Sequence, residues 1–377
     1  MDKNNGEEYM IEQNNIVILG GYGLIGSEIA RLIRIHHPSI SICIAGRSAE
    51  KAASLQRSLG NTDFIQIDIN NPESFQNFPA RPSVIICAVN DTNDNILRKA
   101  LSDGIPLVDI TRWNEPLLKA IELIKSHKPK APILFASSWM AGVSSILARH
   151  AMNGLENPVS VDIDILYAMK DKAGPNAIEF MDQFHKSFAV IENDNLKWIR
   201  PFMDSHMANF PGNRSYRTYR FGTPEQYTLP QIKGIQRAAT RISFDSGFTT
   251  WVLAAVVQSG LWKLISGNRF NALRRSILHS SGNGGSAVLM VEAHNNSHKN
   301  TVTAIDHKGQ SHLTAVGALI QIERILGLDH SPPPEGLTFP EESPVIEGAI
   351  KRMMACGVAI DSIRSGERDA TSRNSKE

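Results

Sequence analysis

The chain has few cysteines, no excess of either charge and no long hydrophobic run. Its 377 residues include three cysteines, Cys43, Cys87 and Cys356, none of them in CxxC or finger spacing. This scarcity excludes a disulfide framework and a structural zinc site, and it favours a reducing, cytoplasmic location. The 39 Lys and Arg residues almost balance the 38 Asp and Glu residues. A nucleic-acid partner is therefore not expected, because the chain has no field to attract a polyanion.

Membrane insertion is also not expected. The longest apolar run, Trp251–Ile265, is interrupted by Gln-Ser-Gly at 258–260 and by Lys263, and it is shorter than the roughly 20 residues that cross a bilayer. The first 15 residues are polar and acidic, unlike a secretory signal. We expect a soluble protein. Because Phe248–Ile265 is apolar nearly all round, we expect it to be buried in the domain or against a second subunit, which suggests a homodimer.

The first 150 residues alternate short apolar stretches with helical patterns. Strands that are apolar on both faces, separated by helices, predict an α/β Rossmann fold, a doubly wound parallel sheet with helices on both sides. The expected strands are Ile16–Leu19, Ile40–Ala45, Phe64–Ile69, Val84–Ala88, Pro106–Ile110 and Ile133–Ala136. The expected helices are Leu24–Ile35, Ala49–Leu59, Asn93–Ser102, Glu115–Ser126 and Ser144–Met152.

The pattern changes after Pro158. Val161–Ile165 and Arg214–Phe221 alternate with period two, and Ser286–His294 is expected to pair with Thr301–Asp306 as a hairpin. These segments predict an open antiparallel sheet with a few helices, which makes this region a mixed α+β domain. Helices return at Thr314–Leu328 and near Val345–Met354.

A glycine-rich turn lies directly between the first expected strand and helix. Its sequence is Gly20-Gly21-Tyr22-Gly23-Leu24-Ile25-Gly26. Gly21 would allow the tight turn, Gly23 would let a pyrophosphate approach the backbone, and Gly26 would let helix and strand pack closely. The helix N-terminus would then hold the pyrophosphate. This context predicts dinucleotide binding; the alternative is that the glycines serve only the turn.

The residues after the second strand indicate which dinucleotide binds. An NAD site has an acidic residue there, whereas this chain has Arg47 and Ser48, with Lys51 one turn later. Arg47 can bind a 2′-phosphate or stack on adenine, so we predict NADP(H); the alternative is that Arg47 is a solvated loop residue. Asp68, after the third strand, could bind the adenine amino group or cap the helix that begins at Pro72.

Other chemistries have little support. The 12 histidines show neither HExxH spacing nor a Cys/His array, so no metal is expected. The glycine pattern also fits extended short-chain dehydrogenases, but no tyrosine has a lysine four residues later. The chain lacks a GxSxG elbow and a phosphate-binding GxxxxGK[ST] loop.

Four stretches resemble the saccharopine dehydrogenase-like family, in its NADP-binding saccharopine reductase branch. They are Val17–Gly26, Ile44–Ser48, Gly104–Thr111, and Thr314-Ala315 together with Pro334–Glu341. The resemblance implies a Rossmann domain (12–155), an inserted mixed α+β substrate and dimerisation domain (156–310) and a C-terminal segment (311–362) that returns to the first domain. The polar, charged tail (363–377) is expected to be disordered. The family usually has a Pro-Gly pair where this chain has Ala141-Gly142, in a loop that faces the nicotinamide in such enzymes.

The same resemblance implies hydride transfer between NADP(H) and a carbon bonded to nitrogen, in an imine or secondary amine derived from an amino acid. Asp109 ends a strand at the ligand edge of the sheet and is the catalytic candidate, although it could instead cap a helix or bind Arg112. Near the cofactor we expect Ala88, Val89 and Asn90. The candidates for substrate binding are Ser138, Trp139, Arg112 and Arg220.

Arg220 is preferred among the strand arginines as the group that would bind a substrate carboxylate. Arg214 and Arg220 are expected on one face of their strand and Arg217 on the other; a solvated face is the alternative for each. Two further functions stay open. One is reduction of a carbonyl or enoyl group on the same scaffold, and the other is non-catalytic NADP(H) sensing.

Overall fold

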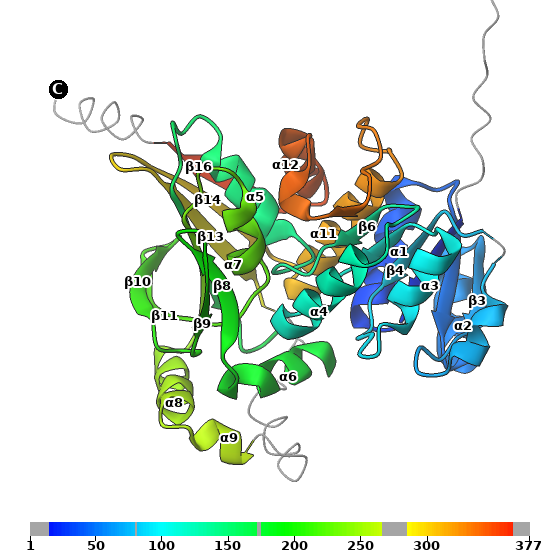
Figure 1. Ribbon diagram of the computed structural model, residues 1–377, viewed down its shortest axis with the longest axis horizontal. Helices are drawn as coiled ribbons and strands as arrows, with labels where there is room; N and C mark the ends of the chain where they lie inside the picture. Colours follow the sequence, from blue (N-terminus) through cyan, green and yellow to red (C-terminus); the bar gives the residue numbers. More distant parts are fainter. Residues whose placement is uncertain (1–14, 80, 172–174, 266–284, 365–377) are drawn as a thin grey trace, which may run out of the picture.

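The computed structural model describes residues 15–79, 81–171, 175–265 and 285–364 (Figure 1). The expected disordered tail lies almost wholly outside these residues, as do residues 12–14 of the first domain. The described chain forms two sheets at opposite ends of the molecule, with the first domain in blue and cyan and the second mainly in green and yellow.

The first sheet is parallel, as predicted. Its seven described strands run in the order β15-β6-β5-β4-β1-β2-β3, and the change of direction between β1 and β4 is where open α/β sheets bind ligands. The strands are β1 (Asn15–Leu19), β2 (Ser41–Gly46), β3 (Thr62–Gln66), β4 (Val84–Cys87), β5 (Leu107–Asp109), β6 (Ile133–Phe135) and β15 (Leu337–Thr338).

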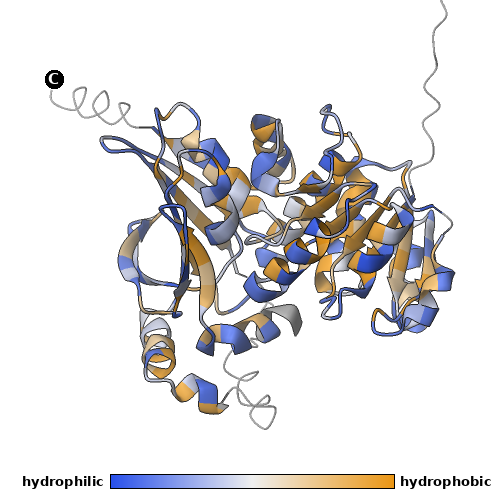
Figure 2. Ribbon diagram, in the orientation of Figure 1, coloured by the Kyte–Doolittle hydropathy of each residue, from blue (hydrophilic) through white to orange (hydrophobic). Residues whose placement is uncertain are grey.

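Helices cover both faces of this sheet, because its strands are apolar on both sides. Ile16 and Ile18 of β1 belong to one core cluster, and Val17 and Leu19 belong to another. The apolar strands are visible in orange in Figure 2. The helices around this sheet are α1 (Leu24–His36), α2 (Ala49–Leu59), α3 (Asn95–Asp103), α4 (Asn114–Lys125) and α11 (Gln310–Ile325), with the 3-10 turn η1 (Pro72–Asn77). Helix α5 (Val143–Met152) packs on the second sheet, and α12 (Ile346–Ala355) and the 3-10 turn η5 (Pro340–Glu342) pack on α5.

The second sheet is mixed, so the prediction of an antiparallel sheet is only partly right. The described strands are ordered β10-β11-β12-β7-β13-β14-β16, with the β8–β9 hairpin attached to β12. Strands β7 and β12 are parallel, whereas β13 and β14 form the predicted hairpin. The strands are β7 (Ser160–Tyr167), β8 (Phe188–Glu192), β9 (Asn195–Ile199), β10 (Ser205–Phe210), β11 (Arg214–Arg220), β12 (Arg237–Phe244), β13 (Ala287–His294), β14 (Lys299–Asp306) and β16 (Ala359–Ile363).

The C-terminal segment joins both sheets instead of returning only to the first. Strand β15 pairs with β6, and α11 packs on α1, as the resemblance implies. Strand β16, however, pairs with β14 in the second sheet. One apolar core cluster runs through both domains, so the two domains are packed together.

The apolar segment, predicted to be buried in the domain or against a second subunit, is partly exposed in the single chain. It forms α8 (Gly247–Gln258) and α9 (Leu261–Ile265), which lie at the lower left of Figure 1. Phe248 is 75% exposed, Trp251 60% and Leu264 70%. The remaining short helices are α6 (Pro175–Asp182), α7 (Glu225–Thr228), η2 (Gln183–His185) and η3 (Leu229–Gln231). Among the described helices, none is long and apolar enough to cross a membrane.

Candidate active site

The glycine-rich turn packs the start of α1 closely against β1. A Cβ on Gly26 would lie 2.3 Å from the carbonyl oxygen of Gly20, so helix and loop could not meet with a side chain there. This confirms the packing predicted for Gly26. The sequence predicts the tight turn at Gly21, but the residue with a left-handed backbone is Gly20, with φ +75°. Gly21 is buried beneath the loop, where a Cβ would meet the Ile18 carbonyl oxygen at 2.9 Å.

The N-terminus of α1 opens toward the ligand edge of the sheet. Its N-cap is Gly23, whose backbone is extended and which offers no side-chain cap. The N–H groups of a first helical turn have no partner within the helix, and the helix dipole is positive there. Gly23 and Leu24 are exposed. The site therefore fits a diphosphate, because it offers donors, positive polarity and no side chain in the way.

A cofactor cleft begins at this helix end. It is lined by Leu19, Gly20, Tyr22, Gly23, Leu24, Ile25, Gly26, Ala45, Gly46, Arg47, Ile67, Asp68, Ile69, Asn70, Ala88, Val89, Asn90 and Glu179. Most of the predicted cofactor residues are in this set. Gly21, Ser48 and Lys51 are not; Ser48 instead caps α2, where its Oγ accepts the N–H of Lys51 at 3.4 Å.

Arg47 lies at one side of the cleft with its side chain exposed. No described residue forms a hydrogen bond or an ion pair with its guanidinium, so the group is available to a phosphate. The loop before it is fixed by Tyr22, whose hydroxyl accepts the backbone N–H of Arg47 at 3.0 Å and of Ser48 at 3.3 Å. Asp68 also lines the cleft, but it does not cap the Pro72 helix. Its Oδ1 accepts the N–H of Asn70, and Asn71 is the cap.

One acidic residue of the cleft, Glu179, was not among the residues predicted from the sequence. Glu179 comes from α6 of the second domain, and its carboxylate accepts a hydrogen bond from the Asn90 amide. This contact links the two domains across the cleft. No local motif could have revealed it, because the two residues are 89 positions apart.

A second hollow, which we call the substrate cavity, adjoins the cofactor cleft. The two share Ile25 and Ala88. The cavity is lined by Ile25, Ala88, Ile110, Thr111, Arg112, Trp113, Ser137, Ser138, Trp139, Met140, Ala141, Tyr167, Phe180, Met181, Thr223, Pro224, Gln310, Ser311 and Thr314. Both domains and α11 contribute, so most of these residues lie far apart in the sequence and formed no recognisable motif.

The loop before α5 carries strained backbone into this cavity. Met140 and Ala141 have left-handed φ angles of 56° and 52°, and Gly142 follows at 94°. Non-glycine residues in this conformation cost about 1–3 kcal/mol each and are concentrated at functional sites. The strain occurs at the Ala141-Gly142 pair, where this chain departs from the resembled family.

Asp109 does not line the cavity. It is fully buried, and its carboxylate accepts hydrogen bonds from Arg112 Nε at 2.7 Å, Thr111 N at 2.9 Å and Thr111 Oγ1 at 2.8 Å. These contacts favour the structural alternative, an ion pair with Arg112, over a catalytic role. Asp91 and Asp94 also contact the Arg112 guanidinium. Burial acts to lower the pKa of Arg112, but Asp109 and Asp94 outweigh it and raise that pKa.

Arg220 lies outside both hollows, contrary to the prediction. It is 3% exposed and donates to Gln226 Oε1 at 2.7 Å, Glu192 Oε1 at 2.9 Å and the Ala238 carbonyl oxygen at 3.1 Å. All three guanidinium nitrogens thus donate hydrogen bonds to residues of the second domain. Strand periodicity predicted which face Arg220 occupies but could not show that this face is filled with partners.

Ser138 and Trp139 do line the substrate cavity. Ser138 Oγ accepts a hydrogen bond from Ser145 at 3.0 Å. Trp139 packs edge-on against Phe221, with ring centroids 5.4 Å apart, and its buried indole Nε1 has no partner among the described residues. Burial raises the pKa of Tyr167, on the cavity wall, to about 12, so its hydroxyl is protonated at neutral pH.

Histidines do not gather in either hollow. Within the described residues, no group of three or more His, Cys, Asp or Glu side chains is arranged to hold a metal. His312 is instead buried against Asp306, with Nδ1 and Oδ2 2.6 Å apart, and His294 lies 3.5 Å from Asp162.

The fold and the cofactor cleft define a doubly wound, dinucleotide-binding protein. Residues 16–131 match the family model of the saccharopine dehydrogenase NADP binding domain. The match confirms the resemblance seen in the sequence and NADP(H) as the cofactor.

The fold over the whole chain is similar to apo histidine-tagged saccharopine dehydrogenase (L-Glu forming) from Saccharomyces cerevisiae, with a TM-score of 0.66 and 11% identity, over 93% of this chain and 100% of that chain. A Gfo/Idh/MocA family oxidoreductase from Vibrio cholerae matches less well, with a TM-score of 0.40 and 10% identity over 90% of this chain and 94% of that chain, and it supports no conclusion. A search of curated proteins found no match.

Proposed function

We propose that the protein is an NADP(H)-dependent oxidoreductase that transfers a hydride between nicotinamide and a substrate carbon held in the substrate cavity. The supporting observation is that the cofactor cleft and the substrate cavity meet at Ile25 and Ala88. A dinucleotide with its diphosphate on α1 and its 2′-phosphate on Arg47 would extend its nicotinamide toward this junction.

NADPH supplies the hydride, and the protein supplies orientation and exclusion of water. In the first candidate reaction, a C=N bond accepts the hydride at carbon. The π electrons move to nitrogen, which takes one proton from water or a cavity hydroxyl. The product is an amine, and the cofactor leaves oxidised. This candidate rests on the likeness to saccharopine dehydrogenase.

The second candidate is reduction of a carbonyl or enoyl group, and one observation favours it. Among the described residues that line the cavity there is no carboxylate that could stabilise an iminium ion. Its hydroxyls and amides are neutral donors suited to a carbonyl oxygen. An amino-acid-derived substrate also finds little support, because Arg220, the predicted carboxylate-binding group, and Arg112, another predicted substrate-binding residue, are already paired.

Spectrophotometric turnover of NADPH separates these candidates. Amine formation from keto acid and amino acid pairs would support the first, and turnover of simple aldehydes, ketones or enones would support the second. Tight NADPH binding with no turnover on either panel would contradict both and would indicate a sensor protein.

We also propose a homodimer that covers the apolar face of α8 and α9, and a cytoplasmic location. The Phe248 and Trp251 rings lie side by side on this face, with centroids 6.2 Å apart, and Figure 2 shows much of the two helices in orange. Light scattering should report a dimer that Trp251→Ser converts to monomer. The control Ile35→Ser, which changes an exposed residue on α1, should stay dimeric. A monomeric wild-type protein at micromolar concentration would contradict the proposal.

A further inference from the structure

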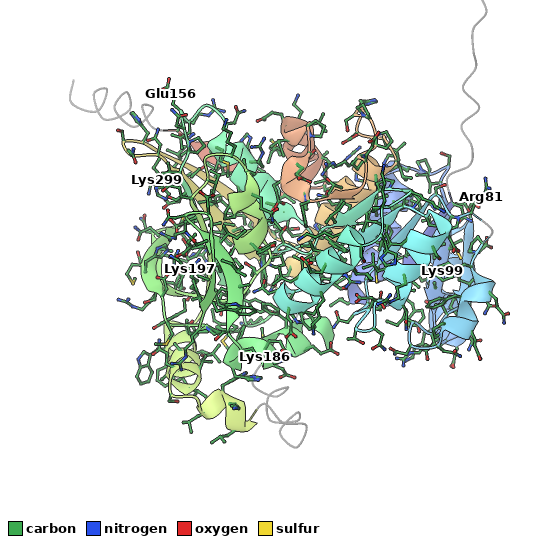
Figure 3. All side chains as sticks on the ribbon, viewed as in Figure 1. Arg81, Lys99, Glu156, Lys186, Lys197 and Lys299 are labelled. Carbon is green, nitrogen blue, oxygen red and sulfur yellow. The ribbon has the colours of Figure 1, made fainter. Side chains whose placement is uncertain are left out.

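The charge of the substrate cavity restricts what it can bind. Arg112 carries the one formal charge among the described lining residues, and it is 4% exposed. Its Nε lies 2.7 Å from Asp109 and its Nη2 lies 3.5 Å from Asp91, and its Nη1 contacts Asp94. These three carboxylates therefore neutralise the positive charge of the guanidinium. The side chains of Arg81, Lys186, Lys197 and Lys299, which are labelled in Figure 3, are exposed.

A carboxylate in this cavity would have no cation of its own. Removing an anion from water costs several kcal/mol unless a counter-charge and hydrogen bonds replace the lost hydration. Arg112 cannot supply them without giving up buried acids that would then be unpaired. Amino-acid substrates and other acids are thus disfavoured by the cavity itself.

The walls of the cavity are apolar and aromatic. The Phe180 ring contacts Trp113 and Trp139, with centroids 6.5 Å and 6.0 Å away. Met140, Met181 and Ile110 complete this surface, together with the rings. Such a lining gains free energy by enclosing hydrocarbon, and methionine side chains adapt to its shape.

Two buried donors in the lining have no acceptor. The indole Nε1 of Trp139 and the amide Nε2 of Gln310 have no hydrogen-bond partner among the described residues. A buried donor without a partner is costly, and these two donors come from separate elements, the loop before α5 and the start of α11. A ligand oxygen or nitrogen with a free lone pair would satisfy one or both.

We infer that the substrate is an electrically neutral, mainly apolar molecule whose single strong acceptor is the carbonyl or imine to be reduced. One part of this inference rests on the proposed function, namely that the hydrogen-bond acceptor of the substrate is the same carbonyl or imine that the hydride reduces. The preference for neutral over anionic ligands follows from the cavity alone.

The test compares benzamide with benzoate, which share a ring and differ in charge. Their binding to the NADPH complex is measured by calorimetry. Benzamide should bind at least about tenfold more tightly, because benzoate would have to shed its hydration without a counter-charge. Equal or tighter binding of benzoate, or no binding of benzamide, would overturn the inference.

Variants locate the binding site. Gln310→Leu should weaken benzamide binding by about three- to tenfold through loss of one hydrogen bond, and the control Gln231→Leu, at an exposed position, should not. Trp139→Phe removes the other donor but keeps an aromatic ring in the cavity wall. If Gln310→Leu fails to fold, Trp139→Phe provides the same test. Unchanged benzamide affinity in the folded variants would also overturn the inference.

Failure of the proposed function is a separate outcome. NADPH binding is measured first on the same sample. If NADPH does not bind, the proposed function fails, and the benzamide and benzoate comparison on the free protein still decides the charge preference.

Discussion

Glu225 should make the stability of the protein fall as the pH rises through neutrality. This residue, at the start of α7, is 0% exposed. Its Oε1 accepts hydrogen bonds from Ser144 at 3.1 Å and Thr240 at 3.2 Å, and its Oε2 has no partner among the described residues. Burial raises the pKa of Glu225 from 4.5 to about 7, and the hydroxyl donors only partly oppose this rise.

The size of the effect follows from linkage. A carboxyl whose folded pKa is raised binds its proton more tightly in the folded state, so stability falls as pH rises from 4.5 to about 7 and the loss is then complete. At about 1.4 kcal/mol for each tenfold change in proton affinity, the rise corresponds to about 3 kcal/mol.

Glu225→Gln removes this titration and keeps an oxygen for Ser144 and Thr240. Urea unfolding, followed by tryptophan fluorescence, gives the free energy of unfolding of both proteins at each pH. The wild-type value minus the variant value should fall by about 3 kcal/mol between about pH 4.5 and pH 8. Other titrating groups cancel in this difference.

Glu115→Gln is the matched control. Glu115 is exposed on α4, and a hydrogen bond from Lys119 lowers its pKa, so the corresponding difference should be small and should rise slightly with pH. A flat difference for Glu225→Gln across the same range would refute the reasoning, since it would mean that the buried carboxyl titrates as it does in the unfolded chain.

Two further predictions concern the cofactor cleft. Gly26→Ala should reduce NADPH affinity and lower the melting temperature, because the new Cβ would lie 2.3 Å from the Gly20 carbonyl oxygen. The control is Gly348→Ala, at an exposed helical position where the new Cβ would lie 3.7 Å from its nearest neighbour; it should change neither property. Unchanged NADPH affinity in Gly26→Ala would contradict the close packing. Arg47→Gln should weaken NADPH binding about 10- to 100-fold in calorimetry and leave NADH binding nearly unchanged, as expected for loss of a charge-assisted hydrogen bond. Arg57→Gln, on the exposed face of α2, is the control, and equal losses for both nucleotides would exclude Arg47 as the phosphate ligand.

The first domain could be predicted from the sequence because its signals are local. An apolar strand, a Gly-rich turn that ends at Gly26, a helix and a second apolar strand follow one another in order and predict a parallel sheet, and Arg47 follows that second strand directly. The second sheet was predicted less well. Strands β7 and β12 are about 75 residues apart in the sequence and pair in parallel, and neither strand alone indicates its partner.

The candidate substrate residues were harder to predict, because a side chain's availability depends on its neighbours. Arg220 has the residue type and position expected of a group that binds a carboxylate, but its guanidinium already donates hydrogen bonds to Glu192 and Gln226. Tyr167 and Gln310, by contrast, lie at the ends of separate elements with no shared motif. Their place in one cavity is a consequence of tertiary packing alone.

Calorimetry of the purified wild-type protein with NADPH and with NADH tests the central claim most directly. Binding of both nucleotides at the α1 N-terminus, with NADPH preferred by about 10-fold or more through Arg47, is the expected result. No binding heat with either nucleotide, or an affinity for NADH equal to that for NADPH, would contradict the account.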